Sequence, residues 1–229
     1  SIEPEVVVNE SPVKWCAVAL SDVVARGKRL EASVFDVEAK QAYMLLTHGK
    51  YPAVNLISKN GPVEKAYYGG RLKRHYVDET EPGAVGFLGS SEMLDCKPEP
   101  VKFMLNDVKT TDVRVKQGVV LISRSGTIGN VTYVGNTLSK FFVSEHAIRI
   151  ECKDFPGYVY AFLKTKIGKL IVCSTQYGAV IQEIEPEHLA TVPIPDAPTM
   201  LKKKIHDLIV RSYELRDESN DLIDQATAL

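Results

Sequence analysis

The apolar positions in the middle of the chain are spaced for short β-strands. Residues 119–122 form the uninterrupted run Val-Val-Leu-Ile after a Gln-Gly turn, which predicts a buried strand. Further strands are predicted at residues 51–58, 83–88, 130–134, 141–143 and 147–150. Since these strands alternate with segments of other character, the pattern predicts an α/β (α+β) fold with a twisted mixed β-sheet.

From Pro156 onward the apolar spacing changes to that of a helix. Apolar side chains recur three and four positions apart, and the lysines fall elsewhere. These positions are Val159, Phe162, Leu163, Ile167, Leu170 and Ile171. We therefore predict a helix here, with short extended pieces at residues 180–181 and 192–195. Residues 1–14 are expected to form an extended arm, and residues 31–46 show no clean period. A tight turn is expected at residues 67–70.

The last segment of the chain carries a heptad seam, in which positions alternate four and three apart. The seam consists of Leu201, Ile205, Leu208, Ser212, Leu215, Ser219, Leu222 and Ala226. On a helix about 40 Å long, this narrow stripe is typical of coiled-coil pairing. We expect this coiled-coil-type helix, residues 199–229, to leave the body formed by residues 1–198 and to pack against another long helix. The alternative is a terminal helix that lies on its own domain.

Length and composition fit a globular protein. The chain has 229 residues, of which 45% are hydrophobic and 25% charged, and this excludes wholesale disorder, collagen and a small disulfide scaffold. The longest apolar runs are too short to span a bilayer, and we expect no secretory signal. Because the chain begins at Ser1, we expect it to be trimmed or cut from something longer.

The formal net charge of −1 conceals alternating blocks of charge. Residues 26–76 contain ten basic and four acidic side chains, a net +6, and residues 108–149 have a net +4. Residues 77–107, between them, have a net −5. Local phosphate contacts rather than the total charge determine affinity for DNA, so the chain can present a basic face. The alternative is that these blocks are ordinary solvated surface.

The spacing of reactive residue types argues against catalysis. The four cysteines form no CxxC pair and the five histidines lack ligand spacing, so we expect no metal site and a reducing, cytoplasmic location. No nucleophile elbow, zinc helix or phosphate loop occurs. Glu145 and His146 are adjacent, and in a strand their side chains would point to opposite faces. One alternative is a metal-dependent nuclease that uses Asp36, Glu38 and Lys40.

Five segments occur in an order that is typical of one protein family. Residues 118–129, Gly-Val-Val-Leu-Ile-Ser-Arg-Ser-Gly-Thr-Ile-Gly, are the most specific of them. The others are residues 15–23, 157–168, 177–181 and 189–195. Together they resemble a target-recognition domain of the DNA-specificity subunit of type I restriction-modification systems, followed by one conserved helix. Residues 26–110 match that domain only in general character.

The resemblance implies a non-catalytic subunit that reads one half of a bipartite target in double-stranded DNA. It implies that the chain is half of a longer subunit, or a half-length subunit that forms a homodimer through its last helix. The implied partners are DNA methyltransferase (modification) subunits and a restriction/translocase subunit. S-adenosylmethionine, ATP and magnesium would belong to those partners, with no cofactor in this chain. The alternative is the target-recognition domain of a fused restriction-methylation enzyme.

The first candidate DNA contacts are the residues that follow the central strand. They are Ser123, Arg124, Ser125, Gly126 and Thr127. Hydroxyl groups and exposed backbone N–H groups suit phosphate oxygens, and Gly126 permits a close approach of the backbone. Arg124 is expected either to contact a guanine edge or to pair with an acid such as Glu145.

Further candidates combine positive charge, aromatic rings and hydroxyl groups. They are Lys59, Arg71, Lys73, Arg74, His75, Tyr76, Ser90, Ser91, Glu92, Lys140, Phe141, Gln176 and Tyr177. Glu92 is expected to accept from a cytosine amino group or to cap a helix, and Gln176 to address an adenine edge. For oligomerisation the candidates are Leu201, Ile205, Leu208, Leu215 and Leu222.

Overall fold

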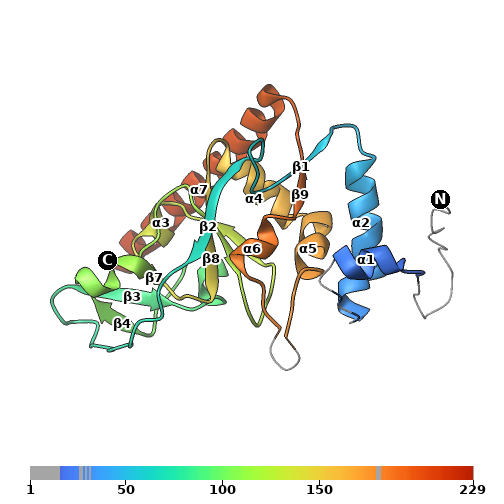
Figure 1. Ribbon diagram of the computed structural model, residues 1–229. Coiled ribbons are helices and arrows are strands. Elements are labelled where there is room, and N and C mark those ends of the chain that lie inside the picture. Colours follow the sequence, from blue (N-terminus) through green and yellow to red (C-terminus); the bar gives the residue numbers. More distant parts are fainter. Residues whose placement is uncertain (1–15, 26–27, 29, 31, 179–181, 229) are drawn as a thin grey trace.

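The computed structural model describes residues 16–25, 28, 30, 32–178 and 182–228 (Figure 1). The predicted N-terminal arm, Trp15 and the extended piece at residues 180–181 lie outside the described residues. The helices are α1 (Leu20–Ala25), α2 (Val37–Thr47), α3 (Asn136–Ser139), α4 (Pro156–Lys164), α5 (Lys166–Cys173), α6 (Pro186–Leu189) and α7 (Thr199–Thr227). Short 3-10 helices lie at η1 (Ala32–Phe35), η2 (Glu92–Leu94) and η3 (Val108–Val113).

The strands are β1 (Ala53–Asn55), β2 (Val63–Tyr68), β3 (Ala84–Leu88), β4 (Phe103–Leu105), β5 (Val120–Ser123), β6 (Val131–Tyr133), β7 (Phe142–Val143), β8 (Ala147–Cys152) and β9 (Pro193–Pro195). A four-stranded antiparallel sheet has the order β2-β8-β5-β6. In a three-stranded sheet, β3 pairs antiparallel with β4 and parallel with β7, and β1 pairs with β9. The predicted α/β fold with mixed β-structure and a long C-terminal helix is confirmed.

The central strand β5 lies at the centre of the core because both of its faces are covered. Val120 and Ile122 pack into a large cluster with side chains of α4 and α5, whereas Leu121 packs into a second cluster with Leu88 and Val143. Successive side chains of a strand point to opposite faces, and a strand covered on both faces is apolar at every position. The uninterrupted Val-Val-Leu-Ile run therefore marks this strand correctly.

Two elements in the first third of the chain escaped the sequence pattern. Helix α2 buries only the narrow line of Ala39, Ala42 and Leu46, while Tyr43 and Leu45 on its other faces are exposed. Exposed apolar residues on the outer faces hide the helical period. Strand β2 includes Tyr67 and Tyr68, where a tight turn was expected, and the chain turns only after Tyr68.

The helix predicted from Pro156 onward is divided in two at Thr165. This residue has an extended backbone, and its hydroxyl accepts a hydrogen bond from the Gly168 N–H as the N-cap of α5. The two helices pack closely at this junction, because a Cβ atom at Gly168 would lie 2.3 Å from the Phe162 carbonyl oxygen. The apolar spacing continues across the break because both helices cover the same core.

Helix α7 lies along its own body, which corrects the expectation that it leaves the body. It packs against α4 and α3, and Tyr213 and Asn220 are buried (Figure 1). The Tyr213 hydroxyl accepts from the Tyr133 N–H at 3.1 Å, and Asp217 accepts from the Asn136 N–H at 2.6 Å. The expectation was wrong because it rested on the apolar seam positions alone. The residues that anchor α7 to the body are polar and lie outside that seam. Within the described ranges, no helix is both long and apolar enough to cross a membrane.

A buried arginine ties the two larger sheets together. The Arg149 side chain, on β8, is 1% exposed. Its guanidinium donates to the carbonyl oxygens of Val143 at 2.7 Å and Val113 at 3.2 Å, which belong to β7 and η3. Burial lowers the pKa of Arg149. These bonds fix the start of β8 relative to the three-stranded sheet, and both sheets end at the candidate site.

Candidate nucleic-acid interface

The strand directions bring several predicted segments to one edge of the four-stranded sheet. Strands β2 and β5 both run antiparallel to β8, with Tyr68 opposite Ile148 and Ser123 opposite Ala147. The ends of β2 and β5 and the start of β8 therefore meet at the same edge (Figure 1). The parallel pair β3 and β7 also ends here, since the Ser144 N–H donates to the Leu88 carbonyl at 3.0 Å.

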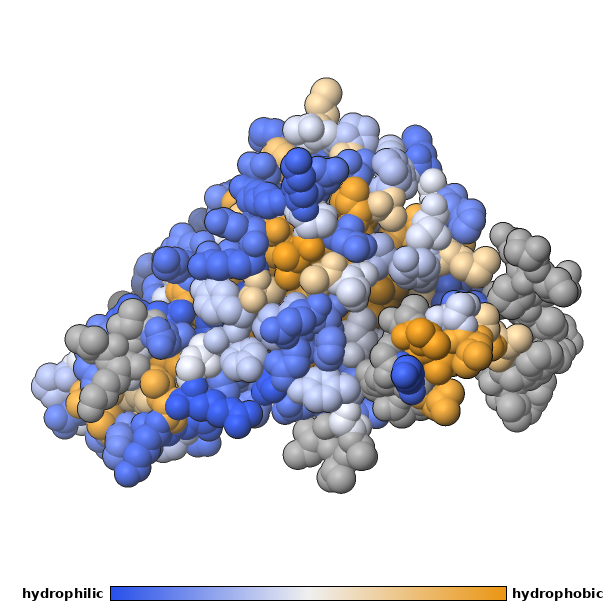
Figure 2. Space-filling model, viewed as in Figure 1, coloured by the Kyte–Doolittle hydropathy of each residue, from blue (hydrophilic) through white to orange (hydrophobic). Residues whose placement is uncertain are grey.

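We define the loop face as the segments at this edge. They are residues 69–76, 89–91, 124–127, 144–146 and 176–177. Residues 176–177 belong to it because Tyr177 and Ser125 both form β-bridges with Glu183. Figure 2 shows mostly hydrophilic surface along the lower edge of the molecule, beneath this sheet. The fold thus gathers four of the predicted DNA-contact segments, which are far apart in sequence.

The basic stretch at residues 71–76 crosses the loop face. Arg71, Lys73 and His75 are exposed, and they make no hydrogen bond or ion pair within the described part of the chain. Tyr76 is 45% exposed, and its ring meets the Phe87 ring edge-on at 6.2 Å between centroids. The stretch therefore presents the charged side chains of Arg71 and Lys73 and part of the Tyr76 ring to solvent.

Arg74 differs from its neighbours because an acid holds it. Its Nη2 atom donates to both carboxylate oxygens of Glu145 at 2.8 and 2.9 Å, and its guanidinium lies 5.1 Å from the Phe87 ring centroid. Burial lowers the pKa of Arg74, but hydrogen bonds and charge from Glu145, together with Tyr76, raise it overall. Burial likewise raises the pKa of Glu145, while its backbone and Arg74 hydrogen bonds lower it overall.

Arg124, which the sequence offered as a DNA contact, is buried and paired with two acids. Its side chain is 4% exposed, and its Nη2 atom forms ion pairs with Glu183, at 2.8 Å, and with Glu185. Its guanidinium also lies 4.8 Å from the centroid of the Tyr68 ring. The alternative of an acid partner is correct in kind, but Glu145 pairs with Arg74 instead. Spacing along the chain could not show that the fold would cover this arginine.

The residues around Arg124 divide between the interior and the surface. Ser123 is fully buried and donates to the Ser90 carbonyl at 3.3 Å, so it links the two loops. Gly126, with a φ of +73°, and Thr127 are exposed at the turn. The Ser125 hydroxyl lies 2.9 Å from Nδ1 of His146. The hydroxyl-bearing turn is therefore available from Ser125 onward.

Sequence reasoning missed His146, and it misplaced the Glu145–His146 pair in a strand. Both residues lie in the turn before β8. The side chains are therefore not forced to opposite faces, and Nε2 of His146 lies 3.9 Å from Oε1 of Glu145. The His146 side chain is 41% exposed on the loop face. No motif marks it, because its position depends on the fold bringing Ser125 beside it.

In two other predicted segments, the candidate side chains form hydrogen bonds with other groups of the chain. The Glu92 carboxylate accepts from the Gly89 N–H at 2.5 Å and so closes its own turn, beside exposed Ser91. The Tyr177 hydroxyl donates to Glu185 at 2.6 Å, and this bond is the main cause that raises the pKa of Tyr177. Gln176 is half-buried beside it. These side chains shape the loop face more than they extend from it.

Three predicted contacts lie away from the loop face. Lys59 precedes β2, at the opposite end of the four-stranded sheet, where its carbonyl accepts from Lys153 at 3.2 Å. Lys140 lies 3.7 Å from Asp221 of α7, and Phe141 packs against the second core cluster. Sheet topology separates them from the other candidates, although their chemistry is similar.

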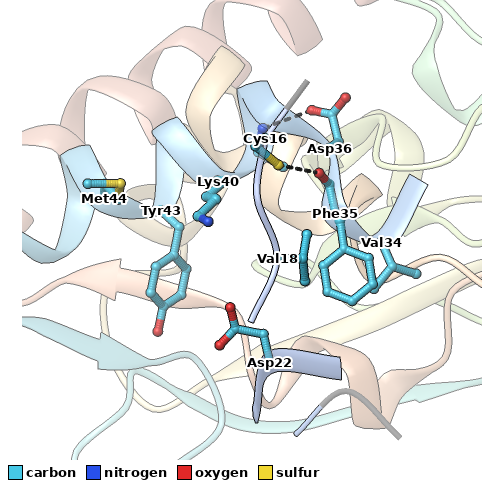
Figure 3. A pocket seen from close by; sticks show the side chains of 10 residues that line it. Cys16, Val18, Asp22, Val34, Phe35, Asp36, Lys40, Tyr43 and Met44 are labelled. Carbon is cyan, nitrogen blue, oxygen red and sulfur yellow. Dashed lines mark hydrogen bonds between the residues drawn. The ribbon is translucent and has the colours of Figure 1, made fainter. Parts of the chain in front are cut away.

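The nuclease alternative finds no support in the arrangement of its residues. The Asp36 carboxylate accepts from the Ala39 N–H at 2.8 Å as the N-cap of α2, and Lys40 donates to the Ala17 carbonyl at 3.2 Å. Asp36 and Lys40 line a cavity of about 300 Å³ with Tyr43 and Met44, but Glu38 does not line it (Figure 3). Among the described residues, no group of three or more His, Cys, Asp or Glu side chains could hold a metal ion.

The predicted oligomerisation residues fall on two sides of α7. Leu201 and Ile205 pack against the large core cluster of their own domain, so they are not part of an outer seam. Leu208, Leu215 and Leu222 are 62%, 48% and 58% exposed and form a line with a spacing of seven residues. Of the five candidates, only these three leucines are therefore exposed on the outer side of the helix.

Comparison with known proteins gives matches in structure alone. No protein-family model and no curated protein matches the chain. A crystal structure of the HsdS subunit from Thermoanaerobacter tengcongensis is 14% identical, with a TM-score of 0.49 over 87% of this chain and 49% of that one. A type I restriction-modification S subunit from M. genitalium is 15% identical, with a TM-score of 0.43 over 68% of this chain and 40% of that one.

A third similar structure was reported for complex assembly and conformational transition of the type I restriction-modification system. It is 13% identical, with a TM-score of 0.47 over 96% of this chain and 62% of that one. The chain thus spans about half the length of the solved chains that it resembles. Those chains are proteins of type I restriction-modification systems.

Proposed function

We propose that this chain recognises a short sequence in double-stranded DNA, as one half of a bipartite target. It does so as a target-recognition domain of the kind found in type I specificity subunits. In this proposal the chain performs no chemistry itself. Methyltransferase subunits and a restriction/translocase subunit act on the bound DNA in the cytoplasm, and they use S-adenosylmethionine, ATP and magnesium.

One observation carries the proposal: free cations and hydroxyl groups from separate segments gather on the loop face. Arg71 and Lys73 are exposed and unpaired within the described residues, and Gly126 and Thr127 are exposed on the neighbouring turn. Phosphate contacts position a protein on duplex DNA, and cations, hydroxyls and backbone N–H groups supply them. A surface with these groups on several loops suits a duplex better than a small molecule.

The outer face of α7 supports the second part of the proposal, which concerns assembly. The line of Leu208, Leu215 and Leu222 is exposed, while the opposite side of the helix is anchored to the body. An exposed leucine line with a spacing of seven fits a second long helix. We propose that this helix belongs to a second copy of the chain or to the other half of a longer subunit.

The proposal is tested by selection from a pool of randomised duplexes, using the chain with and without its methyltransferase subunit. Enrichment of one short half-site is expected, because loops held by a common sheet present a fixed set of contacts. Binding should weaken with salt, since cations that neutralise phosphates release counterions.

A charge-reversed variant is the matched control for this selection. Arg71→Glu with Lys73→Glu should weaken binding to every duplex in the pool. Salt-sensitive binding without any enriched sequence would contradict the proposed function, because phosphate attraction alone produces it. Binding that the two reversals leave unchanged would show that another surface contacts the DNA.

A further inference from the structure

Arg74 is the one cation of the basic stretch at residues 71–76 whose side chain the fold holds in place. Glu145 binds its Nη2 atom through both carboxylate oxygens, at 2.8 and 2.9 Å, and the Phe87 ring lies under the guanidinium at 5.1 Å. Its side chain is nevertheless 34% exposed, so a ligand can reach it. Arg71 and Lys73 have no such supports within the described residues.

The paired acid changes which ligand this arginine favours. Together, Arg74 and Glu145 are electrically neutral, so a phosphate is attracted by one charge and repelled by the other. A guanine edge presents two uncharged acceptors, O6 and N7, and does not meet this repulsion. The guanidinium carries five N–H groups, and Glu145 binds only those of one nitrogen.

Fixed geometry is also what base recognition requires. A base contact discriminates only if its donors are held close to the productive position by packing and by hydrogen bonds from supporting residues. A phosphate contact needs a positive charge nearby, which a freely moving side chain supplies. Arg74 satisfies the first requirement, and Arg71 and Lys73 satisfy the second.

We infer that Arg74 contacts a guanine edge in the major groove, at one position of the half-site, while Arg71 and Lys73 contact phosphates. This inference rests on the proposed function and deepens it. Glu145 and Phe87 are positioning residues, because they act on DNA only through the guanidinium that they hold.

The experiment compares Arg74→Lys, Glu145→Gln and Lys73→Gln with the unaltered chain by selection and by titration at several salt concentrations. Arg74→Lys keeps the charge but loses the planar fork. It should reduce the preference for guanine at one position by about 5- to 150-fold and leave the other positions and the salt dependence unchanged. Lys73→Gln should weaken binding to all sequences alike and lower the salt slope by about 1.

Glu145→Gln tests the positioning role separately. It leaves Arg74 with its full positive charge and a weaker support, so affinity for every duplex should rise while the preference for guanine falls. The inference is overturned if Arg74→Lys retains every base preference, or if Arg74→Lys and Lys73→Gln behave alike. Failure of the unaltered chain to enrich any sequence would contradict the proposed function itself.

Discussion

At the scale of single residues, two arginines that the sequence offered as DNA contacts differ in how far they are exposed. Both pair with carboxylates, but the Arg124 side chain is 4% exposed and the Arg74 side chain is 34% exposed. The charge of Arg124 is enclosed with Glu183 and Glu185, so it supports the base of the loop that carries Tyr177. Exposure, rather than residue type, separates a structural arginine from one that can reach a ligand.

Replacing Arg124 should therefore destabilise the fold. Arg124→Met leaves Glu183 and Glu185 without their cation, and the unfolding free energy should fall by on the order of 3 kcal/mol. Adding Glu183→Gln and Glu185→Gln removes the stranded charges and should restore part of that loss. Urea denaturation of the three proteins measures both effects. A single Arg124→Met variant as stable as the unaltered chain would contradict this account.

Glu185 should make stability depend on pH. Burial raises its pKa, but hydrogen bonds from Arg124 and Tyr177 lower it overall below the ordinary value of 4.5. As the pH falls through 4.5, the unfolded chain takes up a proton before the folded chain does, so the unfolding free energy decreases. The stabilising contribution of Glu185 is fully present above the pKa that this residue has in the unfolded chain. It is lost as the pH falls below that value and through the lower pKa of the folded chain.

Urea denaturation between pH 7 and pH 3.5 checks this dependence. The chain should lose stability steadily below about pH 5. Glu185→Gln is the matched control, because it keeps the shape of the side chain without the titrating group, and its loss over the same range should be smaller. Identical pH profiles would mean that Glu185 does not contribute.

At the scale of elements, α7 carries two different faces. The inner face combines apolar residues with polar anchors, such as Tyr213, Asp217 and Asn220, that bond to the body. The outer face carries Leu208, Leu215 and Leu222, which are 48–62% exposed. If a second helix bound these leucines, α7 would join it rigidly to the body of this chain.

Substitutions on the two faces should have separate effects. Leu208→Asp with Leu215→Asp should abolish self-association in sedimentation and change stability little, because exposed positions tolerate substitution. Tyr213→Phe should leave association intact and lower the unfolding free energy by about 1 kcal/mol, since it removes a hydrogen bond to the Tyr133 N–H. A wild-type chain that stays monomeric at high concentration would restrict pairing to a different subunit.

At the scale of the whole molecule, the four-stranded sheet separates two sets of basic residues. Arg71 follows β2 at the loop face, and Lys59 precedes β2 at the opposite end. Since a strand rises about 3.3 Å per residue, β2 alone places these ends roughly 20 Å apart. A duplex bound to the loop face would not contact both.

Neutralising Arg71 and Lys59 separately tests which end of the sheet contacts DNA. Arg71→Gln should weaken binding to all duplexes and reduce the slope of affinity against salt by about 1, as loss of one phosphate contact does. Lys59→Gln, which removes the same charge at the other end of the sheet, should leave affinity and slope unchanged. Titrations at three salt concentrations distinguish the two. An equal effect of both variants would place the DNA along the side of the sheet.

The apolar pattern predicted most of the sheet and the extent of the last helix, because strand and helix periods are local properties of the chain. Strand β5 and the long α7 were evident in this way. Helix α2 was not, since its buried face is made of small residues and its outer faces are partly apolar. The break at Thr165 was also hidden, because the helices on both sides cover one core.

By itself, the sequence determined the element types, the basic blocks and the chemistry available to the loops. Only the tertiary structure decided which charges meet: Arg74 pairs with Glu145, 71 positions away, and Arg124 with Glu185, 61 positions away. It also decided that the inner side of α7 rests on its own body. The physical reason is that burial and ion pairing depend on which distant segments the sheet brings to one edge, and strand order, rather than residue spacing, determines that.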